Sequence, residues 1–170
     1  LFKLKNIYKA EDNLVFVEKL KLENKKIVFT NGVFDIIHRG HVEYLTEAKS
    51  LGDVLIVGMN SDSSVKMIKG DKRPIVEQNS RAYVLSNLKP VDYVIIFDED
   101  NPYNLINAIK PDVLVKGADW AEDKANMHLE LISAGLDTPY TIILPPYNQQ
   151  PYLPTLDLSP LGEHFVIKPS

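Results

Sequence analysis

The chain has 170 residues, of which 45% are hydrophobic and 25% are charged, and its formal net charge is −4. This composition is typical of a globular protein with material for one domain and an appended piece, and it excludes disorder throughout. The negative net charge argues against a broad nucleic-acid-binding surface and favours a small anionic ligand. The absence of cysteine excludes disulfides and a cysteine nucleophile and is compatible with a reducing cytoplasm. Apolar runs are too short to span a bilayer and no signal-peptide pattern is present, so we predict a cytoplasmic protein that binds no membrane.

The first predicted elements are an extended segment and an amphipathic helix within residues 1–24, which we interpret as a packing cover. A short strand follows at 27–29, and Thr30-Asn31-Gly32 ends it. A helix begins close to His41, because apolar residues recur three apart as far as Leu51. Gly52 is placed to end that helix, as a glycine near the C′ position commonly does.

The remaining elements alternate between strands and helices. Residues 54–59 form a near-continuous apolar run, as in a parallel strand that is covered on both faces. Further strands are predicted at 91–97 and 113–115, with helices at 63–68, after a cap at Asn79 or Ser80, and at 102–109. This order predicts an α/β fold, a Rossmann-like parallel sheet with helices on both faces. Because ligands bind outside the carboxyl ends of such strands, the polar residues at 38–41, 60–62 and 116–119 should converge on one crevice.

The tetrapeptide His38-Arg39-Gly40-His41 lies between the first strand and its helix. Two imidazoles at a helix entry can point to one anion, because the first backbone N–H groups of a helix lack intrahelical partners and the dipole is positive there. Arg81 falls in the first turn of its helix, where a cation opposes the dipole unless an anion lies in front of it. The sequence therefore predicts a phosphate site.

Longer stretches give this tetrapeptide its context. The chain resembles the cytidylyltransferase-like (HxGH) nucleotidyltransferases in five stretches. They are TNGVFDIIHRGH, NSD at 60–62, KGDKRPI at 69–75, residues 79–100 and PDVLVKGADW at 111–120. Within this family the chain is most similar to the adenylyltransferases that activate heptose 1-phosphate for lipopolysaccharide-type sugars. The resemblance implies the HxGH nucleotidyltransferase fold over residues 1–122.

The resemblance also implies a reaction and a set of site residues. ATP would donate a nucleotidyl group to a sugar 1-phosphate, with Mg²⁺ bridging phosphate oxygens and no side-chain metal site. The acceptor phosphate is already largely ionised at neutral pH, so it needs no general base. Self-association is a further implication. The expected catalytic residues are His38, His41, Arg81 and Lys49. The expected nucleotide-binding residues are Thr30, Asn31, Gly32, Val33, Phe34, Arg39, Gly40, Asn60, Lys116, Gly117 and Asp119.

The chain departs from this family pattern after residue 122. Residues 123–170 lack the further helix, strand and STT-type motif of the family and resemble the opening of an ATP-grasp domain, whose lysine in an FVIKP-like strand corresponds to Lys168. An ordinary core helix followed by a surface loop at 149–160 is an equal alternative. We expect the chain to be part of a longer, multidomain polypeptide.

Three alternatives to adenylyl transfer stay open. The chain could transfer a cytidylyl group from CTP to glycerol 3-phosphate, bind nucleotide without turnover, or join the domains of a larger polypeptide. Among single residues, we interpret Asp35 as a holder of its loop through backbone N–H groups rather than as a metal ligand. Tyr44 and Trp120 could stack on a base, although burial is the commoner role of an aromatic.

Overall fold

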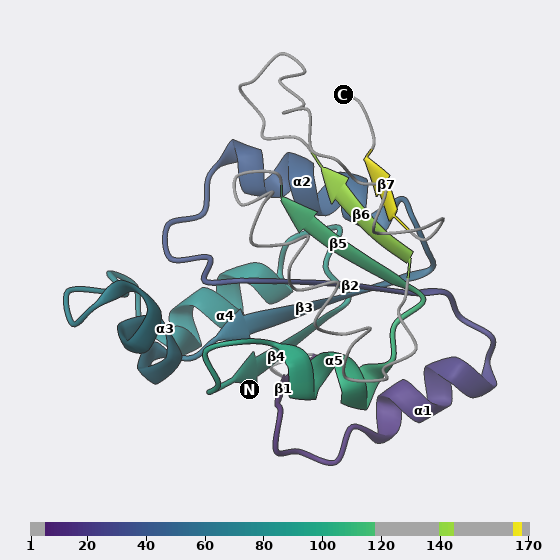
Figure 1. The fold of residues 1–170 in the computed structure, drawn as a ribbon, viewed down its shortest axis with the longest axis horizontal. Helices are drawn as coiled ribbons and strands as arrows, with labels where there is room; N and C mark the ends of the chain where they lie inside the picture. The colour runs from purple at the N-terminus through teal and green to yellow at the C-terminus, as the bar shows by residue number, and fades with distance from the viewer. Residues whose placement is uncertain (1–5, 118–139, 145–164, 168–170) are drawn as a thin grey trace.

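The computed structural model describes residues 6–117, 140–144 and 165–167, and a parallel sheet organises them (Figure 1). Within these residues the sheet has seven strands in the order β1-β4-β3-β2-β5-β6-β7. Every pairing between neighbours is parallel. The strands are β1 (Ile7–Lys9), β2 (Ile27–Gly32), β3 (Val54–Asn60), β4 (Tyr93–Phe97), β5 (Val113–Gly117), β6 (Tyr140–Leu144) and β7 (Phe165–Ile167).

Helices cover both faces of the sheet, as predicted. They are α1 (Val15–Leu22), α2 (Arg39–Lys49), α3 (Asp62–Lys69), α4 (Gln78–Ser86) and α5 (Tyr103–Ile109). Leu45 of α2 and Leu85 of α4 pack in one apolar cluster, whereas Leu20 of α1 and Ile106 of α5 pack in another. Alternate residues of β3 divide between the two clusters, because successive side chains of a strand point to opposite faces. All seven residues of β3 are buried, which confirms a strand covered on both faces.

The chain reverses its direction across the sheet at β2. It passes from β2 to β3 and β4 on one side and then returns to β5 on the other side of β2. At such a switch point the flanking connections leave on opposite faces of the sheet, which opens a crevice at the carboxyl ends of the two strands. The loop after β2 carries the two histidines, so the fold places the predicted phosphate site at this position.

Aspartates hold the opposite, amino-terminal edge of the sheet. Each accepts a hydrogen bond from the backbone N–H of the first residue of a strand or of a residue next to it: Asp53 from Lys26, Asp92 from Leu55 and Asp112 from Ile27, at 2.7–2.8 Å. These bonds satisfy N–H groups that have no strand partner at that edge. They fix where β2 and β3 begin, and thereby the position of the strand ends that carry the candidate site.

Several element boundaries differ from the sequence prediction. Strand β2 runs to Gly32 rather than ending before Thr30, and α4 is capped by Glu77 rather than by Asn79 or Ser80. Gly52 has no positive φ and does not form a left-handed helix end. A side chain there would place its Cβ 2.7 Å from the carbonyl oxygen of Lys26, so close approach to the backbone explains this glycine.

The two strands described after residue 122 extend the same sheet. β6 pairs with β5 from Val113 opposite Tyr140 to Gly117 opposite Leu144, and β7 pairs with β6. The expectation that no family-type strand follows β5 is therefore wrong for residues 140–144. The division at 122 and the ATP-grasp resemblance stay predictions, and Lys168 and the loop at 149–160 lie outside the described residues.

Candidate functional site

The two histidines of the HxGH segment form the cap of α2. His38 has extended backbone angles and its Nδ1 accepts a hydrogen bond from the N–H of Gly40 at 3.1 Å. His41 reaches back, and its Nδ1 accepts a hydrogen bond from the N–H of His38 at 3.4 Å. This arrangement is a capping box made with imidazoles in place of the usual hydroxyl and carboxylate.

The cap determines which ring nitrogen carries the proton. A nitrogen that accepts a hydrogen bond holds no proton, so in each neutral ring the proton lies on Nε2, which is then a donor. The two ring centroids are 4.1 Å apart, so both donors belong to one small region at the amino end of α2. Two N–H donors at the positive end of a helix dipole suit a phosphate group.

Phe34 supports the second imidazole. Its ring centroid lies 5.5 Å from that of His41, and the side chain is buried. Gly32 makes room for this ring, because a Cβ on Gly32 would lie 3.0 Å from Cε2 of Phe34. Phe34 and Gly32, which we predicted to line the nucleotide, thus lie beside the imidazole pair.

The polar residues at the end of β2 are bound to neighbouring elements. The hydroxyl of Thr30 is buried and lies 2.6 Å from the hydroxyl of Tyr44, which donates to the carbonyl oxygen of Val115 at 3.2 Å. The Nζ of Lys116 donates to the side-chain oxygen of Asn31. These contacts join α2 and β5 to β2 across the switch point. The hydroxyl of Tyr44 therefore connects α2 to both β2 and β5, a structural role that the sequence did not predict.

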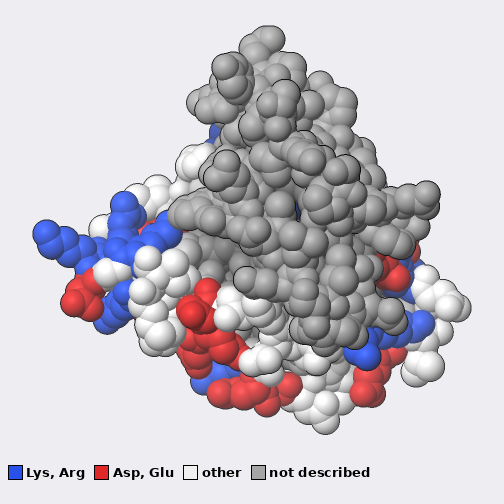
Figure 2. Space-filling model, viewed as in Figure 1, with Lys and Arg blue, Asp and Glu red and all other residues white. Residues whose placement is uncertain are grey.

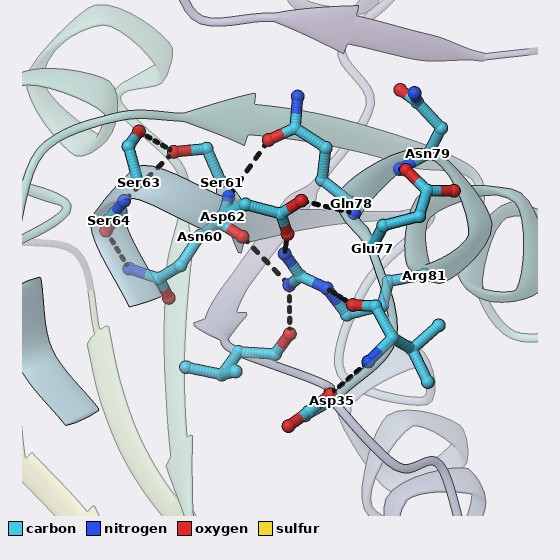
Figure 3. A network of polar contacts seen from close by, with 12 residues as sticks. Asp35, Asn60, Ser61, Asp62, Ser63, Ser64, Glu77, Gln78, Asn79 and Arg81 are labelled. Carbon is cyan, nitrogen blue, oxygen red and sulfur yellow. Dashed lines mark hydrogen bonds and ion pairs between the residues drawn. The ribbon is translucent and has the colours of Figure 1, made fainter. Parts of the chain in front are cut away.

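Asn60 and Arg81 lie at the end of β3, in a network that Figure 3 shows from close by. The side chain of Asn60 donates to the hydroxyl of Ser64 at 2.9 Å and is buried. Arg81 donates to the carboxylate of Asp62 at 2.6 Å and to the carbonyl oxygens of Val33, Asn60 and Val76. Its side chain has no exposed surface, so its guanidinium faces backbone rather than an open anion site. The anion that meets Arg81 in this structure is the carboxylate of Asp62, and the expected contact of Arg81 with a substrate phosphate stays a prediction.

Lys49 does not join the other residues. It is the last residue of α2, and its Nζ contacts the carboxylate of Asp92 and the carbonyl oxygen of Asp53 at the amino-terminal edge of the sheet. A helix rises about 1.5 Å per residue, so Lys49 lies roughly 15 Å along α2 from the histidines. In this structure Lys49 forms an ion pair with Asp92 at that edge, and its predicted role at the triphosphate stays a prediction.

The remaining predicted residues occupy several environments. Arg39 is exposed and its Nε donates to Glu43 at 2.7 Å, one turn further along α2. Gly117 ends β5, and Asp119 and Trp120 lie outside the described residues. Asp35 was predicted to hold its loop through backbone N–H groups. The structure confirms this, because its carboxylate accepts hydrogen bonds from the N–H groups of Ile75 and Val76 at 2.8 and 2.9 Å.

Charge is distributed unevenly around this edge. Figure 2 shows lysine and arginine side chains gathered at α3 and the loop that follows it, where the last turn of α3 carries Lys66 and Lys69. A separate cavity lies at the carboxyl ends of β1 and β4, lined by Lys9, Gln78, Asp98 and Glu99 among others. The described part of the chain has no group of three or more potential metal ligands, and no helix in it is long and apolar enough to cross a bilayer.

Comparison with known proteins places this geometry in a family. Residues 29–146 match the model of the family described as cytidylyltransferase-like. The chain is 62% identical over 104 residues to the bifunctional protein HldE of Helicobacter pylori (strain Shi470), a match that covers 61% of this chain and 22% of that protein. It is 64% identical over 101 residues to the bifunctional protein HldE of a Nitratiruptor species, over 59% of this chain and again 22% of that protein. The chain thus spans less than a quarter of the length of these curated relatives.

Solved structures agree in fold. A lipopolysaccharide core biosynthesis protein from Thermoplasma volcanium is 34% identical with a TM-score of 0.62, over 72% of this chain and 96% of that one. A pantoate-beta-alanine ligase from Francisella tularensis is 16% identical with a TM-score of 0.64, over 85% of this chain and 68% of that one, which shows the fold alone. The chain belongs to the cytidylyltransferase-like family and contains a nucleotidyltransferase-like domain related to HldE.

Proposed function

We propose that this domain transfers AMP from ATP to a sugar 1-phosphate, heptose 1-phosphate by resemblance, and releases pyrophosphate. The observation that carries the proposal is the imidazole capping box, which holds two histidine rings at the start of α2 with their centroids 4.1 Å apart. The similarity to a lipopolysaccharide core biosynthesis protein, at 34% identity, supports the choice of a sugar-type acceptor. We propose that the reaction takes place in the cytoplasm. We also propose that the domain is part of a longer chain, because the match covers only 22% of relatives that are named bifunctional.

The reaction needs alignment and charge stabilisation rather than a nucleophilic side chain. An oxygen of the acceptor phosphate, whose second pKa is roughly 6, attacks the α-phosphorus of ATP in line and forms the new P–O bond. The bond from the α-phosphorus to the bridging oxygen breaks, and pyrophosphate leaves with its electron pair. His38 and His41 donate hydrogen bonds to phosphoryl oxygens, whose negative charge they stabilise as it redistributes. Gly40 permits close approach of the triphosphate to the backbone of α2.

We propose that Mg²⁺ accompanies the nucleotide, since Mg²⁺ is commonly bound together with substrate phosphates and water rather than by a cage of protein ligands. When bound, it would neutralise charge on the phosphates. The basic residues at the end of α3, Lys66 and Lys69, lie on the same edge of the sheet and could add positive charge at longer range.

The test is a matrix of pyrophosphate-release assays with Mg²⁺. ATP and CTP are each offered with heptose 1-phosphate and with glycerol 3-phosphate, to the wild type and to a His41→Ala variant. The proposal predicts turnover with ATP and heptose 1-phosphate that falls by about 10²–10³-fold in the variant, the usual effect of losing one transition-state donor. Turnover with CTP and glycerol 3-phosphate alone would support the cytidylyl alternative, and ATP binding without turnover would indicate a binding module.

A further inference from the structure

Phe34 has a backbone conformation that its residue type rarely adopts. Its φ is +50°, in the left-handed region that favours glycine and asparagine. A bulky residue stays there only when its surroundings hold it, and such residues gather at functional sites. In this structure the conformation turns the Phe34 ring inward, where it is buried against the imidazole of His41. The orientation of His41 is thus linked to the backbone angle of Phe34.

The residues on both sides of Phe34 are fixed by other segments. The carbonyl oxygen of Val33 accepts a hydrogen bond from Nη1 of Arg81 at 2.6 Å. The carboxylate of Asp35 accepts hydrogen bonds from the N–H groups of Ile75 and Val76. Phe34 is therefore held between two anchors, and both anchors lead to the segment just before α4.

Arg81 is the centre of this arrangement. Its Nε donates to the carbonyl oxygen of Val76 at 2.8 Å and its Nη1 also donates to the carbonyl oxygen of Asn60 at 2.9 Å. Its Nη2 donates to the carboxylate of Asp62, and Figure 3 shows Asp35, Asn60 and Asp62 around it. A guanidinium presents donors in several fixed directions from one rigid plane, which an ammonium group cannot reproduce. One buried side chain thereby ties the ends of β2 and β3 to the start of α4.

We propose that Arg81 and Asp35 are positioning residues, which hold Phe34 in its left-handed conformation and so set the orientation of His41. Neither residue touches substrate under this proposal, and both act through the Phe34 ring. The catalytic consequence rests on the proposed nucleotidyl transfer. The structural consequence, a change in the environment of the His41 ring, holds in the protein without any ligand.

The experiment compares Arg81→Lys, Phe34→Leu and the double variant, with Asp92→Asn as a matched control. Asp92 holds backbone and an ion pair at the opposite edge of the sheet, so its loss affects stability without reaching His41. Two quantities are measured on folded protein: the NMR signals of the His41 ring without ligand, and kcat and KM of pyrophosphate release. Phe34→Leu removes the aromatic ring and leaves the Arg81 network intact, so it tests the same contact if Arg81→Lys does not fold.

We expect Arg81→Lys and Phe34→Leu both to move the His41 signals and to lower kcat by about tenfold or more, since small misplacements of a catalytic group have effects of this size. The double variant should lose no more than the larger single loss, because both act through one contact. Asp92→Asn should leave the His41 signals in place. Unmoved His41 signals in either folded variant would overturn the proposal. Moved signals in a protein whose wild type has no turnover would retain the positioning role and refute the proposed function.

Discussion

Substitutions at His38 separate its role as a helix cap from its proposed role as a donor to phosphate. Its Nδ1 accepts a hydrogen bond from the N–H of Gly40, and under the proposed function its Nε2–H donates to a phosphate oxygen. Asparagine caps helices well through its side-chain oxygen, whereas alanine cannot cap. We therefore compare His38→Asn, which keeps the capping bond and removes the ring donor, with His38→Ala, which removes both.

The two variants should differ in stability and agree in activity. Loss of a helix N-cap costs about 0.5–2 kcal/mol, so His38→Ala should unfold at a temperature lower by roughly 1–8 °C for a chain of this size. His38→Asn should stay within about 1 kcal/mol of the wild type. Both should lose about 10²–10³-fold in kcat of pyrophosphate release, because both lack the Nε2–H donor.

Thermal unfolding and steady-state pyrophosphate release, measured on the same preparations, test this reasoning. Wild-type turnover in His38→Asn would show that the cap is all that His38 provides. Equal destabilisation of both variants would show that the capping bond from Gly40 does not contribute as the structure indicates.

Three further predictions concern stability. Burial raises the pKa of the Asp35 carboxyl, but hydrogen bonds from Val76, Ile75 and Arg73 outweigh burial and lower this pKa below its usual 3.8. The ionised carboxylate therefore stabilises the folded state above pH 3.8, and this contribution is lost as the pH falls through the lowered pKa. Urea unfolding should accordingly show Asp35→Asn less stable than wild type near neutral pH and the difference shrinking below about pH 4; a constant difference would contradict this. Gly52→Ala should reduce the free energy of unfolding by about 1–3 kcal/mol in the same assay, because its Cβ meets a backbone carbonyl. Lys49→Gln should lower the unfolding temperature, because it removes the ion pair with Asp92, and it should leave KM for ATP unchanged. A raised KM would show that Lys49 contributes to ATP binding.

Most of the fold could be predicted because local patterns specify it. The apolar run of β3 favours a buried strand, and the three-residue spacing of apolar positions in α2 favours a helix. The alternation of strands and helices implies a parallel sheet with covered faces. The switch point at β2 then places the HxGH segment at the crevice. The position of His38 and His41 at a helix start was likewise predictable, since a glycine-containing polar segment follows a strand there.

The roles of Arg81 and Phe34 could not be predicted in this way. Arg81 contacts carbonyl groups from segments far apart in the chain, and no local pattern shows where those groups lie. A phenylalanine also gives no sign of a left-handed backbone, which sequence reasoning assigns to glycine or asparagine. Lys49 differs, because counting the helical rise from His38 would have placed it at the far end of α2.

The central claim is that the imidazole cap of α2 binds the triphosphate, and amide NMR with a non-hydrolysable ATP analogue and Mg²⁺ tests it most directly. We predict that titration moves the amide signals of residues 38–42 most strongly and that these changes weaken in His41→Ala. Amide changes centred instead on the cavity beside Lys9 and Asp98, with residues 38–42 unaffected, would contradict it.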